Sequence, residues 1–163
     1  MLFDLLHAEL APRQITVVLD RALHDVSLMF KDESVRVRRD YEANLPLIPL
    51  DEGLCEQAFV NLVQNAYDAM GSGGGILQVT AARAHNAGRE GVEVRVEDTG
   101  PGIPADLREQ IFNPFFTSKK DGVGLGLSIV AKIVDDHHGW IKLESENSHG
   151  ARFHVFFPES PNE

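Results

Sequence analysis

Apolar residues recur at every third or fourth position in three segments of the chain, as expected for helices that bury one face. This spacing predicts helices over residues 16–31, 52–70 and about 125–137. The run GSGGG at 71–75 ends the second helix, because glycine readily adopts the backbone conformations that stop a helix.

Apolar and polar residues alternate in much of the remaining chain, which predicts strands with one buried face. The predicted strands are 35–41, ILQVTAAR and VEVRVED on either side of the loop HNAGREG, and WIKLESE and ARFHVFF near the C-terminus. The two strands around HNAGREG are expected to form a hairpin. Since strands and helices do not alternate strictly, we predict an α/β (α+β) two-layer sandwich. About three helices would cover one face of a mixed sheet of about five strands.

The segment 99–123 is rich in glycine, proline and phenylalanine, and only PADLREQ within it predicts a short helical turn. Loops of this length in a compact domain are usually functional or mobile. We therefore expect this segment to be functional or mobile.

The composition is that of one globular domain, with 163 residues, 43% of them hydrophobic and 25% charged. No apolar run approaches the roughly 18 residues that a membrane-spanning helix needs. The one cysteine, Cys55, excludes an internal disulfide and a thiolate zinc cluster and favours a reducing compartment. We therefore expect a cytoplasmic domain without membrane contact of its own, whether or not a longer parent protein is anchored in a membrane.

The formal net charge of −10 makes the chain as a whole repel nucleic acid and anionic lipid, so nucleic acid is not an expected partner. A polyanionic ligand would have to be bound locally, by backbone N–H groups, a metal ion or a few lysines. Lys119 and Lys120 are the only adjacent pair of lysines, and they precede a glycine-rich segment.

The predicted helix 52–70 carries a polar stripe opposite its apolar face, formed by Gln57, Asn61, Asn65 and Asp68. Such a stripe is usually a solvated face. Two asparagines one turn apart are unusual for that purpose, because the asparagine side chain competes for backbone hydrogen bonds and disfavours helix. Their amide oxygens are suitable acceptors for a hydrated Mg²⁺ ion.

Asp98 ends the strand VEVRVED on the same face as its three valines, which is the face predicted to be buried. Two interpretations are open. Asp98 opens the turn DTGPG through an Asx bond, or it accepts a hydrogen bond from the exocyclic amine of a ligand. In the second case, Gly100 and Gly102 leave room for a flat ring beside the backbone.

The segment DGVGLGLSIVAKIV runs from three glycines, Gly122, Gly124 and Gly126, into the third predicted helix. Free N–H groups at a helix start, together with the helix dipole, favour an anion. The spacing matches neither a P-loop nor a dinucleotide-binding fingerprint. A hinge and a phosphate site are both consistent with it.

Taken in order, NLVQNAYDA, DTGPGI, IFNPFFTSK and GVGLGLSIV resemble the N, G1, F and G2 boxes of the catalytic and ATP-binding domain of bacterial sensor histidine kinases, in the GHKL superfamily. The closing GWIKLESENSHGARFHVFFP resembles the terminal hairpin of that domain, with Gly150 in the third glycine box. The resemblance covers residues 14–158 and implies a Bergerat-type fold with a mobile ATP lid over about 105–123. Residues 1–13 are then expected to be the tail of a preceding helical hairpin, and residues 159–163 a C-terminal tail.

The resemblance implies that the domain binds ATP and Mg²⁺. Asn65 would be the Mg²⁺ ligand, Asn61 would lie beside the phosphates, and Asp98 would contact the adenine amino group. The residues implied to line the base are Gly100, Gly102 and Ile103.

In the implied lid, Phe112 and Phe115 are anchors. Mobile glycines and backbone N–H groups that meet the phosphates are implied at Gly122, Gly124, Leu125, Gly126 and Leu127. Four side chains could reach the β- and γ-phosphates, and the sequence does not decide among them: Thr117, Ser118, Lys119 and Lys120. With Asn61 and Asn65, Lys119 completes the set of candidate catalytic residues.

The amide of Asn61 favours a kinase over a hydrolase. Gyrase-like members of the superfamily carry a glutamate at this position to activate water, and an amide cannot accept that proton. The implied reaction is transfer of the ATP γ-phosphoryl group to a histidine, which needs little deprotonation. The implied partners are a histidine-bearing dimerisation hairpin and a response regulator, and this chain by itself is expected to be monomeric.

Two positions depart from the family pattern. Asp68 stands where many members have a lysine, and Trp140 stands where a second glycine often follows HG, which we expect to change only local packing. HAELAP at 7–12 echoes the phosphoacceptor H box but is interpreted as coincidence, so the acceptor histidine is expected outside this chain. His137 and His138 are expected to sit favourably at a helix C-terminus or on the surface. The alternatives on the same fold are an anti-sigma-type serine kinase and a nucleotide-gated binding module without transfer.

Overall fold

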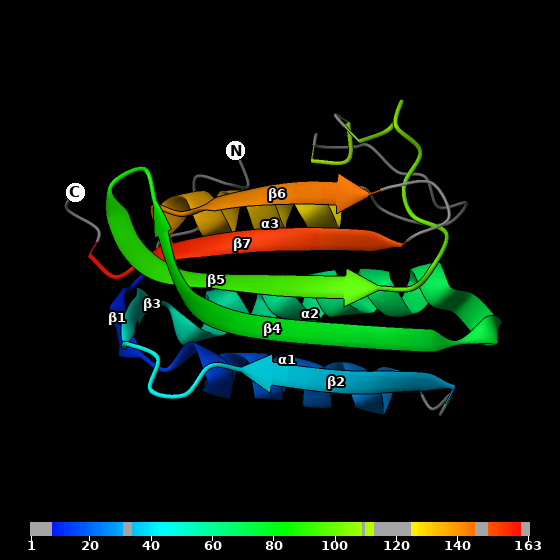
Figure 1. The fold of residues 1–163 in the computed structure, drawn as a ribbon, viewed down its shortest axis with the longest axis horizontal. Coiled ribbons are helices and arrows are strands. Elements are labelled where there is room, and N and C mark those ends of the chain that lie inside the picture. Colours follow the sequence, from blue (N-terminus) through cyan, green and yellow to red (C-terminus); the bar gives the residue numbers. More distant parts are fainter. Residues whose placement is uncertain (1–7, 31–33, 109, 113–124, 146–149, 161–163) are drawn as a thin grey trace.

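The computed structural model describes residues 8–30, 34–108, 110–112, 125–145 and 150–160. Within these residues, five strands form one mixed sheet in the order β2-β4-β5-β7-β6 (Figure 1). The pairing of β2 with β4 is parallel, and the other pairings in this sheet are antiparallel. The strands are β2 (Val35–Tyr41), β4 (Gly75–Asn86), β5 (Arg89–Asp98), β6 (Trp140–Ser145) and β7 (Ala151–Pro158).

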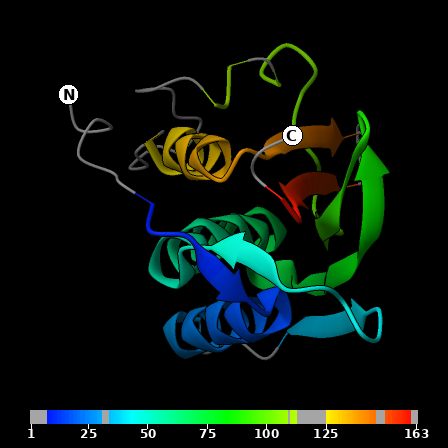
Figure 2. The same cartoon turned by 90° about the vertical axis from the view of Figure 1, so that its left-hand side faces the viewer.

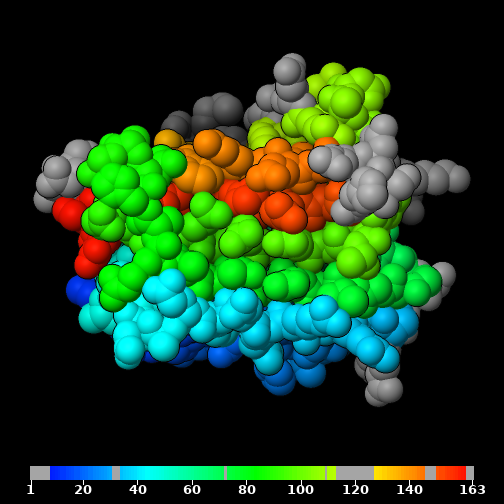
Figure 3. Space-filling model, viewed as in Figure 1, coloured from blue at the N-terminus to red at the C-terminus, as the bar shows by residue number. Residues whose placement is uncertain are grey.

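The α-helices of the described chain cover one face of this sheet (Figure 2). They are α1 (Ile15–Met29), α2 (Glu52–Met70) and α3 (Leu125–Asp136). The other face carries none of them and is the face seen in Figure 3. The core lies between the two layers and includes Leu19, Phe59, Val94, Ile133 and Phe157. The predicted two-layer sandwich is therefore confirmed. None of the described helices is both long and apolar enough to cross a lipid bilayer.

Helix α2 begins and ends at the residues that its sequence predicts. Asp51 is its N-cap, and the Asp51 side chain accepts a hydrogen bond from the Leu54 N–H at 3.1 Å. This bond satisfies one of the donors that the first helical turn leaves without a partner. At the other end, Gly71 adopts a φ of 61°, and a single 3-10 turn, Gly71–Gly73, leads into β4.

The prediction of a loop at HNAGREG is wrong, because most of this segment is strand. β4 and β5 pair as far as Asn86 opposite Arg89, which leaves Ala87 and Gly88 as a two-residue turn. Both turn residues have positive φ, 51° and 79°, as tight hairpin turns require. The polar composition of the segment indicated a loop, whereas its polar residues lie on paired, largely solvent-facing strands.

A second, two-stranded sheet was not predicted. Its strands are β1 (Ala11–Arg13) and β3 (Ile48–Leu50), which pair antiparallel with Pro12 opposite Pro49. Proline cannot donate to a strand ladder, and each strand has only three residues, so neither gave a strand signal. The pairing attaches residues 11–13 to the chain just before α2.

Trp140 contacts two other strands of the sheet. Its ring stacks on Phe156 of β7 at a centroid distance of 5.7 Å, and its Nε1 donates to Asn86 Oδ1 at 2.9 Å. The side chain thereby joins the first residue of β6 to the last residue of β4.

His137 and His138 directly follow the C-terminal end of α3, as expected, but His137 is buried and only His138 is exposed. The His137 Nδ1 donates to the Ile133 carbonyl at 2.7 Å, and its Nε2 accepts from the Asp51 N–H at 2.9 Å. This pattern requires the neutral imidazole, which links the C-terminal end of α3 to the N-terminal end of α2. Burial lowers the pKa of His137, because the charged form loses its hydration.

We expect His137 to make the domain less stable in mild acid. A lowered pKa in the folded state means that the unfolded chain binds this proton more readily. The contribution of neutral His137 is therefore present above the unfolded pKa of about 6.5 and is lost as the pH falls below it. Melting temperatures of the wild type and His137→Gln between pH 8 and pH 5 check this, since glutamine does not titrate. His24→Gln, at an exposed position of α1, should keep the wild-type slope; a His137→Gln profile as steep as that of the wild type contradicts the assignment.

Candidate nucleotide site

One end of the sheet gathers predicted site residues from several elements. β5 ends at Asp98, and Leu77, near the start of β4, lies opposite it. Because α2 leads directly into β4, the C-terminal end of α2 lies at the same end. β6 begins at the other end of the sheet, directly after α3, so the N-terminal end of α3 also points toward the Asp98 end (Figure 1).

Asp98 lies on the buried face of β5 and is 8% exposed. Its Oδ1 accepts from the Gly100 N–H at 2.9 Å and from the Ala151 N–H at 3.4 Å. Burial raises the pKa of this carboxyl, and the two hydrogen bonds oppose that shift. The expected Asx bond is therefore present, and so is the apolar environment expected for a ligand acceptor. The valines that share its face are Val92, Val94 and Val96, all buried.

The loop after β5 packs against the C-terminal end of α2. A Cβ atom at Gly100 would lie 3.1 Å from the Ala69 carbonyl oxygen and 3.1 Å from Asp98 Oδ1. The Thr99 hydroxyl donates to Met70 Sδ at 3.8 Å. Glycine at position 100 thus allows the helix that carries the two asparagines and the strand that carries Asp98 to come together.

Asn61 and Asn65 are half-buried on α2, whereas Gln57 and Asp68 are exposed, so the predicted polar stripe is present. Among the residues that the structure describes, no three or more His, Cys, Asp or Glu side chains are grouped to hold a metal ion. Mg²⁺ bound through nucleotide phosphates keeps water ligands and needs only one or two protein oxygens. The amide oxygen of Asn65 fits that requirement, and its role as a ligand stays a prediction.

The described part of the loop contains three further residues predicted for the site, and their contacts with a ligand stay predictions. Ile103 and Phe112 are half-buried and pack on the core. Phe112 meets Phe153 of β7 edge-on, with ring centroids 6.2 Å apart. Gly102 has a φ of 81°, which only glycine adopts readily. Where a short helical turn was predicted, residues 105–108 form consecutive turns.

The third helix begins at Leu125, as predicted, and includes Gly126. Leu127 is partly buried against the core. The other predicted lid residues lie outside the described residues: Phe115, Thr117, Ser118, Lys119, Lys120, Gly122 and Gly124. Their predicted contacts with the phosphates stay predictions.

Ser145 belongs to this end of the sheet and was not predicted. It is 7% exposed, accepts from the Ile103 N–H at 2.8 Å and donates to the Gly150 carbonyl at 3.0 Å. It ends β6 on the same face as Leu143, which packs on the core. A polar residue at the end of an inward-facing row is the signal that identified Asp98, and it would also have identified Ser145.

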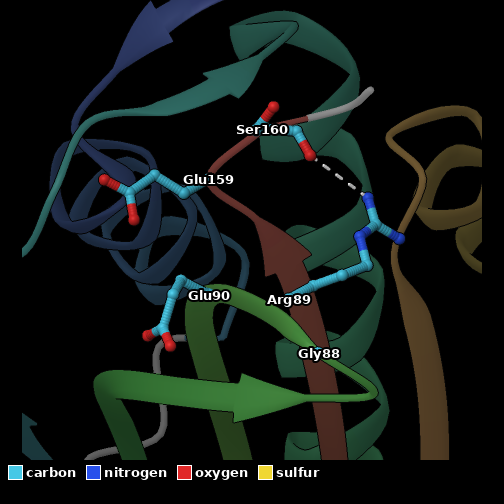
Figure 4. A pocket seen from close by; sticks show the side chains of 5 residues that line it. All are labelled: Gly88, Arg89, Glu90, Glu159 and Ser160. Atoms are coloured by element: carbon cyan, nitrogen blue, oxygen red, sulfur yellow. Dashed lines mark hydrogen bonds between the residues drawn. The ribbon is translucent and has the colours of Figure 1, made fainter. Parts of the chain in front are cut away.

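A hollow of about 380 Å³ lies at the opposite end of the sheet (Figure 4). Arg89 begins β5 and Asp98 ends it, which puts the hollow roughly 30 Å from the predicted site at the rise of an extended strand. The Arg89 guanidinium donates to the carbonyls of His138 and Ser160 at 3.0 and 3.3 Å. None of the predicted nucleotide contacts lines the hollow, which is formed by Gly88, Arg89, Glu90, Glu159 and Ser160.

Comparison with known families decides what this arrangement is. Residues 50–161 match the family described as "Histidine kinase-, DNA gyrase B-, and HSP90-like ATPase". The chain belongs to this family of ATPases. The sensory histidine kinase/phosphatase NtrB of Klebsiella oxytoca is 37% identical over 147 residues, which are 86% of this chain and 42% of NtrB. The chain thus spans less than half the length of this curated relative.

Solved structures agree with the family. The catalytic domain of histidine kinase ThkA is 31% identical with a TM-score of 0.81, over 94% of this chain and 97% of that one. Full-length ShkA in complex with AMPPNP is 31% identical with a TM-score of 0.78, over 96% of this chain and 33% of that one. ThkA in complex with the response regulator protein TrrA is 28% identical with a TM-score of 0.77, over 96% of this chain and 43% of that one.

The resemblance predicted from the four boxes is therefore confirmed. This chain is an ATP-binding catalytic domain of the histidine kinase type. The serine kinase and the nucleotide-gated binding module are not favoured, because the matched relatives are sensor histidine kinases.

Proposed function

We propose that this domain binds ATP with Mg²⁺ and transfers the γ-phosphoryl group to a histidine on a helical hairpin of its parent protein, from which it passes to a response regulator. The observation that carries the proposal is the buried carboxylate of Asp98, at the end of β5 and beside the helix that bears Asn61 and Asn65. The similarity to kinases solved with AMPPNP and with a response regulator supports the ligand and the second partner. A cytoplasmic location is part of the proposal, supported by the one free cysteine, Cys55.

Asp98 is the acceptor for the adenine amino group. Backbone N–H groups of Gly100 and Ala151 hold its Oδ1, and we assign Oδ2 to the ligand. In apolar surroundings a hydrogen bond from the amine is strengthened, because water competes poorly there. The amine also favours the ionised carboxylate and so opposes the effect of burial on the pKa of Asp98.

Asn65 holds the metal, and Asn61 lies beside the phosphates one turn earlier on α2. When bound, Mg²⁺ neutralises the charge that develops on the phosphate oxygens during transfer. Asn61 cannot take a proton from water, so the site suits a nucleophile with a free lone pair, such as a neutral imidazole nitrogen. A nitrogen–phosphorus bond forms as the bond between the γ-phosphorus and its bridging oxygen breaks. ADP leaves, and the other imidazole nitrogen releases its proton.

Replacing Asn65 with alanine is expected to slow phosphoryl transfer by roughly a hundredfold, the typical effect of losing one group that stabilises transition-state charge. The domain is mixed with Mg-ATP and the histidine hairpin of its parent protein, and the acid-labile phosphate on the hairpin is measured over time. Gln57→Ala, an exposed position on the same stripe of α2, serves as the matched control and should transfer at the wild-type rate.

Three results would overturn this proposal in different ways. Undiminished transfer by Asn65→Ala removes Asn65 from the site. An acid-stable product on a small protein indicates a serine kinase. Tight ATP binding without any phosphorylated hairpin indicates a binding module.

A further inference from the structure

We propose that Ser145 is a positioning residue that holds Asp98 and the loop after it in the geometry needed to select adenine. This inference rests on the proposed function and adds to it a specificity role for the far strand of the sheet. We assign Ser145 no contact with the ligand itself; it acts through its neighbours.

The Ser145 hydroxyl connects two segments that meet Asp98 from different sides. It accepts from the Ile103 N–H at 2.8 Å, in the loop that follows β5. It donates to the Gly150 carbonyl at 3.0 Å, directly before β7. Ser145 itself is 7% exposed; its bond to Gly150 is buried, and its bond to Ile103 is part-buried.

Each of these segments in turn contacts Asp98. Gly150 lies so close that a Cβ atom there would overlap the Asp98 carbonyl oxygen. The next residue, Ala151, is the ladder partner of Ser145 and donates its N–H to Asp98 Oδ1 at 3.4 Å. On the other side, the Gly100 N–H donates to the same oxygen at 2.9 Å. The Ser145 hydroxyl therefore joins the two segments that supply the N–H groups that orient the carboxylate.

The chemistry of the hydroxyl explains why serine suits this position. One oxygen accepts one bond and donates another, so it satisfies a backbone N–H and a backbone carbonyl at the same time. Removing it takes this partner from a buried carbonyl and a part-buried N–H, which typically costs a factor of about ten or more in an equilibrium that depends on their positions. An apolar side chain of similar size cannot replace it.

The inference predicts a selective loss in Ser145→Ala. Its affinity for ADP with Mg²⁺ is expected to fall roughly tenfold. Its affinity for IDP is expected to stay within about twofold of the wild-type value. IDP lacks the exocyclic amine that would donate a hydrogen bond to Asp98. Calorimetric titration of both nucleotides measures the two constants. Ser145→Thr retains a hydroxyl and is expected to recover most of the affinity for ADP.

Matched variants separate positioning from stability. Val18→Ala removes buried volume from α1, remote from the site, and is expected to lower the melting temperature without changing the ratio of ADP to IDP affinity. If Ser145→Ala does not fold, Ser145→Cys is used, since it keeps the side-chain volume with a sulfur that accepts hydrogen bonds weakly. The same selective loss is expected for it.

The outcomes distinguish this inference from the proposed function. A wild type that binds neither nucleotide overturns both. A wild type that prefers ADP, together with a serine variant of unchanged preference, overturns only the role of Ser145. Equal loss of ADP and IDP affinity also overturns it, because that result reports general damage to the fold.

Discussion

Replacing Asp98 with asparagine is expected to weaken ADP binding by roughly a hundredfold or more, while the domain stays folded. The new amide can still accept from the Gly100 and Ala151 N–H groups through its oxygen. Its nitrogen then occupies the position assigned to the ligand acceptor. Two donors would face each other, because neither that nitrogen nor the adenine amine accepts a hydrogen bond. Titration calorimetry with ADP and Mg²⁺ measures the loss.

The same substitution is expected to leave the free domain at least as stable as the wild type. The pKa of Asp98 is raised in the folded state, so the folded state binds this proton more tightly than the unfolded chain does. Stability from this group is therefore lost as the pH rises above the unfolded pKa of about 3.9, and asparagine removes that cost at neutral pH. Melting curves without nucleotide check this. Asp40→Asn, an exposed carboxylate on β2, is the control for the change in net charge.

Two results would contradict the role of Asp98. An Asp98→Asn domain that binds ADP as the wild type does would mean that the carboxylate serves only the Asx turn. A variant that unfolds would mean that its charge is needed for the loop itself. After either result the assignment of the fold would still hold, but the assignment of Asp98 as the adenine contact would be withdrawn.

The features that follow from local periodicity were predictable. Helix α2 was predicted at its observed bounds, because its apolar positions repeat over 19 residues between the N-cap Asp51 and Gly71. The burial of Asp98 followed from the alternation of β5, since a residue two positions after a buried valine faces the same side. The order of the four boxes then identified the family.

The features that depend on contacts between distant segments were not predictable. The burial of His137 requires that α3 ends against Asp51, which lies 86 residues earlier in the chain. The hydrogen bond between Ser145 and Ile103 spans 42 residues. The alternation of β6 places Ser145 at the end of an inward-facing row, but only the pairing of elements shows that it bonds to Ile103, or that His137 is buried. The sequence thus predicted the residue assigned to contact the ligand, Asp98. It missed the residue that positions Asp98, which is Ser145.

Gly150→Ala is expected to be the most destabilising single change near the site, by about 3 kcal/mol or more. Gly150 has a φ of 82°, where a side chain is strained. Its added Cβ would also overlap the Asp98 carbonyl oxygen and lie 3.3 Å from the Thr99 Cα. These are backbone atoms beside the pairing of β5 with β7, so no side-chain rotation relieves the overlap. Urea denaturation measures the loss of stability.

Gly88→Ala is the matched control, because Gly88 has a φ of 79° with nothing within 4 Å of an added Cβ. It should show the conformational cost alone, about 1 kcal/mol, so the difference between the two variants isolates the overlap with Asp98.

Adding nucleotide then separates a loss of stability from a displacement of the nucleotide site. A ligand that binds only the folded state raises the melting temperature by an amount set by its affinity. ADP should therefore raise the melting temperature of Gly88→Ala as much as that of the wild type. It should raise the melting temperature of Gly150→Ala much less. Equal shifts in both variants would show that the close approach of β7 stabilises the fold without shaping the nucleotide site.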